Sequence, residues 1–276
     1  MFPVLLGLSA AIAWGAADFG GGFASKRTNS YGVVIGSHII SLGAFVILAL
    51  LLNEPIPPFR DWLFGAVAGL AGWIGLMLLY RALAEGKMSL AAPVSALVAA
   101  TMPVVFASIT QGLPEYLTFL GFALALAAVW LLSSGEALTQ IRVKELGLPL
   151  SAGVTFGLFF ILLHQASGQS IVWPVIATRI GSITGLLVYT SLTRRSWLPS
   201  RQHWLLLAFI GIIDATGTAC YALSARTGQL DVAVVLSSLY PGATVLLAWV
   251  FLKEKISHIQ AIGVILALGA IILLTL

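Results

Sequence analysis

Long apolar segments joined by short polar connections constrain this chain more than any other feature. A helix of roughly 20 mostly apolar residues crosses a bilayer. Ten segments have that length: 3–24, 31–52, 62–84, 89–111, 115–134, 146–167, 171–193, 203–225, 231–252 and 257–275. Charged residues make up only 9% of the 276 residues, against about 25% in a soluble domain. The sequence therefore predicts an all-α integral membrane protein with ten transmembrane helices.

The first apolar segment is followed by positive charge rather than preceded by it. A cleaved signal peptide begins with a charged region, whereas Lys26 and Arg27 come after the apolar run. We therefore interpret residues 3–24 as a retained first span.

The two halves of the chain are similar at an offset of 142 residues. Tryptophan and glycine recur in one register without a gap: Trp62 with Trp204, Gly69 with Gly211, Gly75 with Gly217 and Gly86 with Gly228. Such matches are informative because abundant Leu and Ala do not explain them. The sequence predicts two five-helix repeats, 1–142 and 143–276. Because five is odd, the second repeat is inverted in the membrane, a plan that recurs in secondary transporters.

Positive charge is concentrated in the connections that follow odd-numbered segments. These connections hold 11 of the 14 Lys and Arg residues, whereas the other side holds only Arg60 and Arg226. Lys and Arg favour the cytoplasmic side. We therefore expect a bacterial inner membrane protein with both termini outside. The same connections account for the net charge of +4, so no nucleic-acid partner is needed.

Three stretches of the chain resemble the EamA-like family of the drug/metabolite transporter superfamily: AAIAWGAADF, YRALAEGKMSLAAPVSAL and VVLSSLYPGATVLLAWVFLKEKIS. The resemblance covers essentially the whole chain and depends on the order and spacing of the stretches. It implies a substrate cavity between the halves that opens alternately to each side. It also implies a secondary transporter, an exporter or exchanger in the first place and otherwise an importer, for small metabolites, amino-acid-like compounds or drugs.

Asp214 is an acid near the middle of an apolar segment, where insertion costs about 2.5–3.5 kcal/mol. Helical spacing places Gly211, Asp214, Thr218 and Tyr221 on one face, so the carboxylate faces protein or a cavity. Its repeat mate is Gly72, which indicates that the fold does not need an acid at this level. Asp214 is therefore predicted to bind a substrate cation, to carry a proton, or to hold two helices together by a buried hydrogen bond.

Four other polar side chains lie within apolar segments, and with Asp214 they form the candidate proton or charge relay: Asp18, His38, His164 and Arg179. Asp18 and His38 are expected at a similar depth. Their pairing would suit a proton relay because histidine changes charge near neutral pH; the alternatives are a structural pair or no contact. Arg179 keeps its charge, so it requires a substrate carboxylate, a water-filled vestibule, the membrane surface or an acidic partner on a neighbouring helix.

Aromatic and hydroxyl side chains complete the predicted substrate cavity: Trp14, Asp18, Trp73, Tyr80, Asp214, Thr218, Tyr221, Ser237 and Tyr240. Ordinary packing or a place at the membrane interface is the alternative for the aromatic residues. Pro103 and Pro241 are predicted helix breaks. Such breaks are tolerated where the freed backbone groups line a cavity or meet a neighbouring helix.

Other functions are less compatible with the sequence. A lipid or polyprenyl-carrier flippase of the same superfamily would require a laterally open, more apolar groove. An intramembrane aspartyl protease would require two acids at one depth, whereas Asp18 and Asp214 are expected at different depths. A passive channel is disfavoured by charge at the midplane and by the broken helices.

We expect no enzymatic activity, no cofactor and no metal. The expected partners are a small-molecule substrate, protons and the lipid bilayer, and the protein is expected to function as a monomer.

The predicted orientation is testable at Arg201, which lies in a connection expected to be cytoplasmic. We expect a membrane-impermeant maleimide to label the Arg201→Cys variant in inside-out vesicles but not in intact cells. The unsubstituted chain is the control, because its native thiol, Cys220, lies in an apolar segment. Labelling from outside the cell would reverse the predicted orientation.

Overall fold

The computed structural model describes residues 2–25, 29–85, 88–133, 146–198, 203–252 and 257–275, which form helices and turns without a strand. The helices are α1 (Phe2–Ser25), α2 (Ser30–Leu51), α3 (Phe59–Glu85), α4 (Met88–Gln111), α5 (Tyr116–Ser133), α6 (Gly147–Ala166), α7 (Val172–Leu192), α8 (Trp204–Thr227), α9 (Leu230–Ser237), α10 (Tyr240–Leu252) and α11 (His258–Thr275). Each apolar segment of the sequence corresponds to a helix, except that the ninth is divided into α9 and α10.

The helices are those of a multi-pass membrane protein. Within the described ranges, seven helical segments are long and apolar enough to cross a membrane, and α9 with α10 counts as one of them. Three shorter apolar helices, Val94–Thr110, Tyr116–Leu132 and His258–Leu274, accompany them. Large apolar side chains such as Leu205, at 87% exposed, cover the outer surface. Such side chains are stable there because they face lipid.

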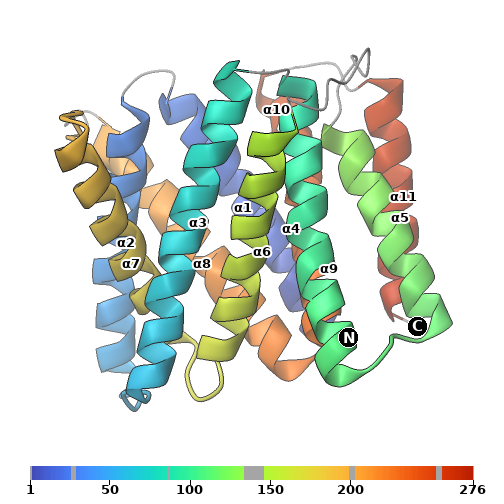
Figure 1. The fold of residues 1–276 in the computed structure, drawn as a ribbon, viewed down its shortest axis with the longest axis horizontal. Helices are drawn as coiled ribbons and strands as arrows, with labels where there is room; N and C mark the ends of the chain where they lie inside the picture. The colour runs from blue at the N-terminus through green and yellow to red at the C-terminus, as the bar shows by residue number, and fades with distance from the viewer. Residues whose placement is uncertain are drawn as a thin grey trace.

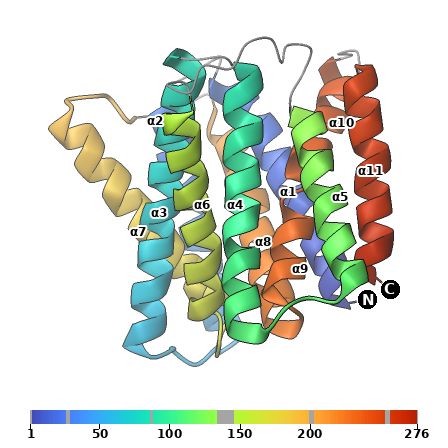
Figure 2. The same ribbon diagram turned by 45° about the vertical axis from the view of Figure 1, so that its right-hand side comes forward.

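Two helix pairs form the centre of the bundle, α1 with α8 and α3 with α6. On one side α2 packs against α7, and at the opposite edge α5 packs against α11 (Figure 1). Both termini lie at one end of the bundle, together with the α2–α3 and α6–α7 connections (Figure 1). We call this the terminal end, and the other end the opposite end. The last turns of α7 lean outward at the opposite end (Figure 2).

The chain is interrupted immediately before Pro241. The backbone N–H of Ser238 donates to the carbonyl of Val234 at 2.8 Å, and α10 begins two residues later with Pro241 in its first turn. Proline is favoured there because the first N–H groups of a helix have no acceptor within that helix. The interruption leaves backbone groups of residues 238 and 239 outside regular helix, in the interior of the bundle.

The predicted break at Pro103 is wrong, because α4 runs through this residue without interruption. A proline removes one helical hydrogen bond, but membrane helices tolerate this where neighbouring helices pack around them. Gly153 and Gly157 bring α6 against α4: a Cβ added at these positions would meet Ser95 and Met102 within 3 Å.

Glycine lets the backbones of the central and lateral helices approach closely. A Cβ added at Gly211 of α8 would lie 2.1 Å from the carbonyl oxygen of Ser37 on α2. One added at Gly69 of α3 would lie 2.1 Å from the carbonyl oxygen of Thr178 on α7. Small residues that allow such contacts are typical of membrane helix interfaces. The two contacts fix α2 and α7 beside the core and thereby position the polar residues that these helices carry.

The close approach at Gly211 predicts a loss of stability in the Gly211→Ala variant. The added methyl group would overlap the Ser37 carbonyl, and overpacking of this kind costs about 1–3 kcal/mol. We expect a lower midpoint of thermal unfolding in detergent. Gly43→Ala in α2 is the matched control, because a Cβ there meets nothing within 4 Å and alanine favours helix. Equal midpoints for the two variants would contradict the close approach.

Candidate functional site

A cavity of about 380 Å³ lies among the central helices. Its lining comes from α1, α2, α3, α4, α6, α7, α8 and the break before α10. Polar side chains in the lining are Asp18, His38, Thr178, Arg179, Ser182, Asp214, Thr218, Ser238 and Tyr240. The remainder is apolar or aromatic. Sites for small molecules in proteins have this character and measure roughly 300–1,000 Å³.

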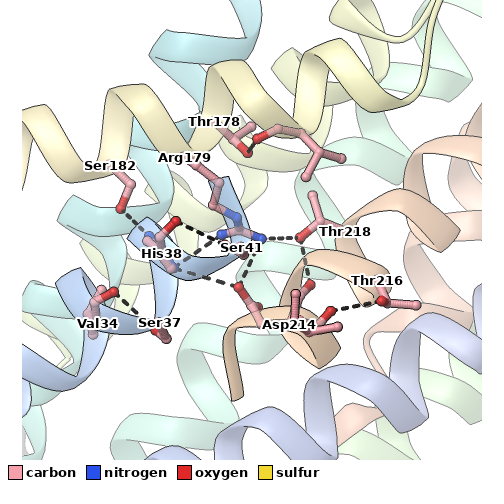
Figure 3. A network of polar contacts seen from close by, with 12 residues as sticks. Val34, Ser37, His38, Ser41, Thr178, Arg179, Ser182, Asp214, Thr216 and Thr218 are labelled. Carbon is pink, nitrogen blue, oxygen red and sulfur yellow. Dashed lines mark hydrogen bonds and ion pairs between the residues drawn. The ribbon is translucent and has the colours of Figure 1, made fainter. Parts of the chain in front are cut away.

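Arg179 of α7 is the centre of a buried polar cluster in the cavity wall (Figure 3). Its Nη2 lies 2.9 Å from Oδ2 of Asp214 on α8 and donates to Oγ1 of Thr218 at 3.0 Å. Its Nη1 lies 3.1 Å from Nε2 of His38 on α2. The Arg179 side chain is only 7% exposed. Because an arginine always carries its charge, Asp214 provides the counter-charge that burial requires.

His38 extends this cluster to a third helix. Its Nε2 faces Arg179, which can only donate, so Nε2 is the acceptor. The hydrogen therefore lies on Nδ1, which is 3.0 Å from the hydroxyl oxygen of Ser182 on α7. Nε2 is also 3.6 Å from Oδ2 of Asp214. In this arrangement His38 is neutral, and the charge of the cluster is that of the Arg179–Asp214 pair.

The structure resolves two alternatives that the sequence left open. Arg179 has an acidic partner on a neighbouring helix, and that partner is Asp214. The Asp18–His38 pair is not formed, because Arg179 occupies the acceptor nitrogen of His38. Asp18 of α1 instead lies exposed in the cavity. Although Asp18 and Asp214 were expected at different depths, they face the same cavity and are close enough to interact electrostatically.

Trp14 of α1 lies one turn before Asp18 and lines the same cavity. Its ring centroid is 5.7 Å from that of Phe160 and 5.8 Å from that of Tyr221. These contacts hold the indole in a fixed orientation. Trp73 of α3 contributes a second indole to the lining.

Two residues predicted in the cavity lie behind its wall. Tyr221 and Ser237 are both fully buried, and neither belongs to the lining. The Tyr221 hydroxyl donates to the carbonyl of Phe160 at 2.9 Å, and the Ser237 hydroxyl donates to the carbonyl of Val234 at 3.0 Å. Ser238 lines the cavity instead, because the interruption of the helix begins at this residue.

The comparisons with known proteins agree with this architecture. The sequence model of the EamA-like transporter family matches residues 1–134 and 144–276. The chain belongs to the EamA-like transporter family. Members of this family are membrane transporters of the drug/metabolite transporter superfamily. A crystal structure with 17% sequence identity shares the fold, with a TM-score of 0.84 over 99% of this chain and 96% of the other. No curated protein sequence matches the chain.

Besides Ser238, two polar positions of this EamA-like cavity were not predicted from the sequence. Thr178 and Ser182 flank Arg179 on α7 and belong to the lining. Helical spacing was the available signal, since Ser182 lies three residues after Arg179 and four after Thr178, and residues three or four apart share a helix face. His164 lies outside the lining, and its Nδ1 is buried without a hydrogen-bond partner among the described residues. The side chain of Tyr80 lies outside the described part of the structure.

The ion pair predicts that the two cavity acids differ in their effect on stability. Asp214→Asn leaves Arg179 without a counter-charge, and breaking a buried pair costs about 3–5 kcal/mol. That range is an upper bound here, because 25% of the Asp214 side chain is exposed. We expect a clear fall in the midpoint of thermal unfolding in detergent.

Asp18→Asn is the matched control, because Asp18 has no protein partner among the described residues, and its midpoint should stay close to that of the parent. Arg179→Met combined with Asp214→Asn removes both charges and should recover part of the lost stability. Equal effects of the two Asp→Asn variants would contradict a structural role for the ion pair.

Proposed function

We propose that this chain is a secondary transporter that carries a small metabolite through its central cavity by alternating access. The cavity is the observation that carries the proposal. It lies inside a bundle of membrane helices, takes its lining from both halves of the chain, and contains charged groups. The buried charge pair favours a polar substrate over the lipid-linked substrate of a flippase.

Matched helix contacts support the proposed pair of inverted repeats, 1–142 and 143–276. A Cβ added at Gly75 of α3 would touch Phe156 of α6, and one added at Gly217 of α8 would touch Trp14 of α1. Gly217 follows Gly75 by 142 residues, and Phe156 follows Trp14 by 142 residues. Each contact therefore joins the repeat counterparts of the two residues in the other contact. This is expected if a two-fold axis relates the halves.

The terminal end of the bundle is closed by a contact between two connections, which we call the Glu54 clasp. The Ser170 hydroxyl donates to the Glu54 carboxylate. The indole N–H of Trp173 donates to the Glu54 backbone carbonyl at 3.2 Å. The Trp173 ring also packs on Trp62, with centroids 5.5 Å apart. The clasp joins the α2–α3 connection to the start of α7.

The cavity extends away from the clasp. Val34 in the first turns of α2 and Leu79 in the last turns of α3 belong to its lining, and both lie toward the opposite end. We infer that this conformation is open toward the opposite end and closed at the terminal end. With the orientation inferred from Lys and Arg, it is inward-facing in a bacterial inner membrane. Alternating access then requires the Glu54 clasp to open.

Transport is tested with the purified protein in vesicles, supplied with a panel of radiolabelled amino acids, amines, sugars and nucleosides. We expect saturable uptake or counterflow of at least one compound. A locked variant is the control: Glu54→Cys with Ser170→Cys in a Cys220→Ala background, joined by a short bis-methanethiosulfonate cross-linker.

Because Glu54 and Ser170 are in contact, cross-linking should hold the terminal end closed and reduce the uptake to background. A reducing agent should restore it, and each single-cysteine variant should be insensitive to the reagent. Full transport after complete cross-linking would contradict alternating access through this end. Background uptake of every compound by the unlocked protein would contradict the transport function.

A further inference from the structure

Asp18 differs from the other charged groups of the cavity. Arg179 and Asp214 pair with each other, and His38 accepts from Arg179. The Asp18 side chain is exposed within the cavity and forms no hydrogen bond or ion pair with a described residue. It is an accessible carboxylate inside a membrane protein, and nothing in the described part of the chain neutralises it.

The charges of the cavity therefore leave an excess of one negative charge when Asp18 is ionised. The Arg179–Asp214 pair is neutral as a whole, and the hydrogen-bond geometry makes His38 neutral. A charge surrounded by helices and lipid attracts an opposite charge far more strongly than it would in water. Asp214 is near enough to repel Asp18. A bound cation would satisfy Asp18 and relieve this repulsion.

Aromatic side chains around Asp18 are suited to the body of such a cation. Trp14 precedes Asp18 by four residues on α1, so both share one helix face. Tyr240, at the break before α10, is close enough to interact electrostatically with Asp18. The other aromatic residues of the wall are Trp73, Phe156, Phe159 and Phe160. The faces of aromatic rings attract cations and pack against apolar groups.

Among the described residues of this wall, the cationic side chain is Arg179, and it offers no free site for a carboxylate. The two terminal nitrogens of Arg179 are engaged by Asp214, Thr218 and His38. Its Nε is without a partner but is buried and out of reach of a ligand. An amino acid or an organic acid would have to displace Asp214 from Arg179. An amine without a carboxylate requires no such displacement.

We propose that Asp18 is the cation-binding residue of this cavity and that the substrates are organic monocations, above all amines with an aromatic or apolar body. This inference rests on the transport function proposed above. It assigns different tasks to the two acids: Asp18 contacts the substrate, and Asp214 neutralises Arg179.

The test uses four probes that share one phenyl body and differ in charge: phenethylamine (cation), 2-phenylethanol (neutral), phenylalanine (zwitterion) and 3-phenylpropionate (anion). Binding of radiolabelled phenethylamine to the purified protein is measured by equilibrium dialysis, and the other three are tested as competitors. We expect phenethylamine to bind at least tenfold more tightly than each competitor.

Asp18→Asn should weaken phenethylamine binding at least tenfold, and Asp18→Glu, which keeps the charge, should retain most of it. Asp61→Asn, an acid of α3 outside the cavity lining, is the matched control and should bind as the parent does. Thermal unfolding shows that each variant is folded. If Asp18→Asn does not fold, comparison of the four probes on the parent protein and on Asp18→Glu still shows whether the site prefers a cation.

Three results would overturn the assignment. They are phenethylamine binding no tighter than 2-phenylethanol, unchanged binding in Asp18→Asn, and tighter binding of phenylalanine or 3-phenylpropionate. Different results would contradict the proposed transport function. Phenethylamine binding that depends on Asp18, without uptake of any compound into vesicles, supports the site and contradicts transport. Uptake that is unchanged in Asp18→Asn for every transported compound supports transport and contradicts the role of Asp18.

Discussion

The ion pair between Arg179 and Asp214 is the interaction on which the polar interior of this protein depends. An arginine cannot lose its charge, and a charge buried among apolar helices is stable only with a partner. The pair joins α7 to α8, and His38 joins α2 to both. Three helices are thereby held at one level of the bundle. The glycine contact at Gly211 brings α2 against α8, and the contact at Gly69 brings α7 against α3.

Pairing also separates the roles of the two cavity acids. Asp214 lies in the wall and neutralises Arg179, whereas Asp18 faces the open volume without a protein partner among the described residues. The wall around Asp18 contains indole and phenol rings. In the part of the wall that the structure describes, Asp18 is available to a cation, whereas the nitrogens of Arg179 are engaged or buried. Substrate charge is therefore the property on which its selectivity should depend.

The proposed alternating access requires contacts at the closed end that can break. The Glu54 clasp is suited to this because it consists of two hydrogen bonds to Glu54, from Ser170 and Trp173, and one ring contact. The buried pair between α7 and α8 is a poorer candidate, since separating its charges inside the membrane costs several kcal/mol. We therefore expect α7 and α8 to move together with their pair intact while the connections at the terminal end separate.

By itself, the sequence determined the helical membrane architecture and the family. Both follow from properties that are local along the chain: the lengths of the apolar segments, the turn residues between them, and the order of three short stretches. Helical spacing also placed Asp214 and Thr218 on one face, and the sequence indicated Trp14, Asp18, Trp73 and Tyr240 as cavity residues. All of them belong to its lining.

Only the tertiary structure decided which polar groups meet. The sequence suggested a pair of Asp18 with His38, whereas the folded chain pairs Asp214 with Arg179 and leaves Asp18 in the cavity without a partner among the described residues. It also placed Tyr221 and Ser237 behind the wall and kept α4 continuous through Pro103. The physical reason is that these outcomes depend on how each helix is rotated against its neighbours. Backbone contacts between distant segments set that rotation, and no pattern within a single helix specifies it.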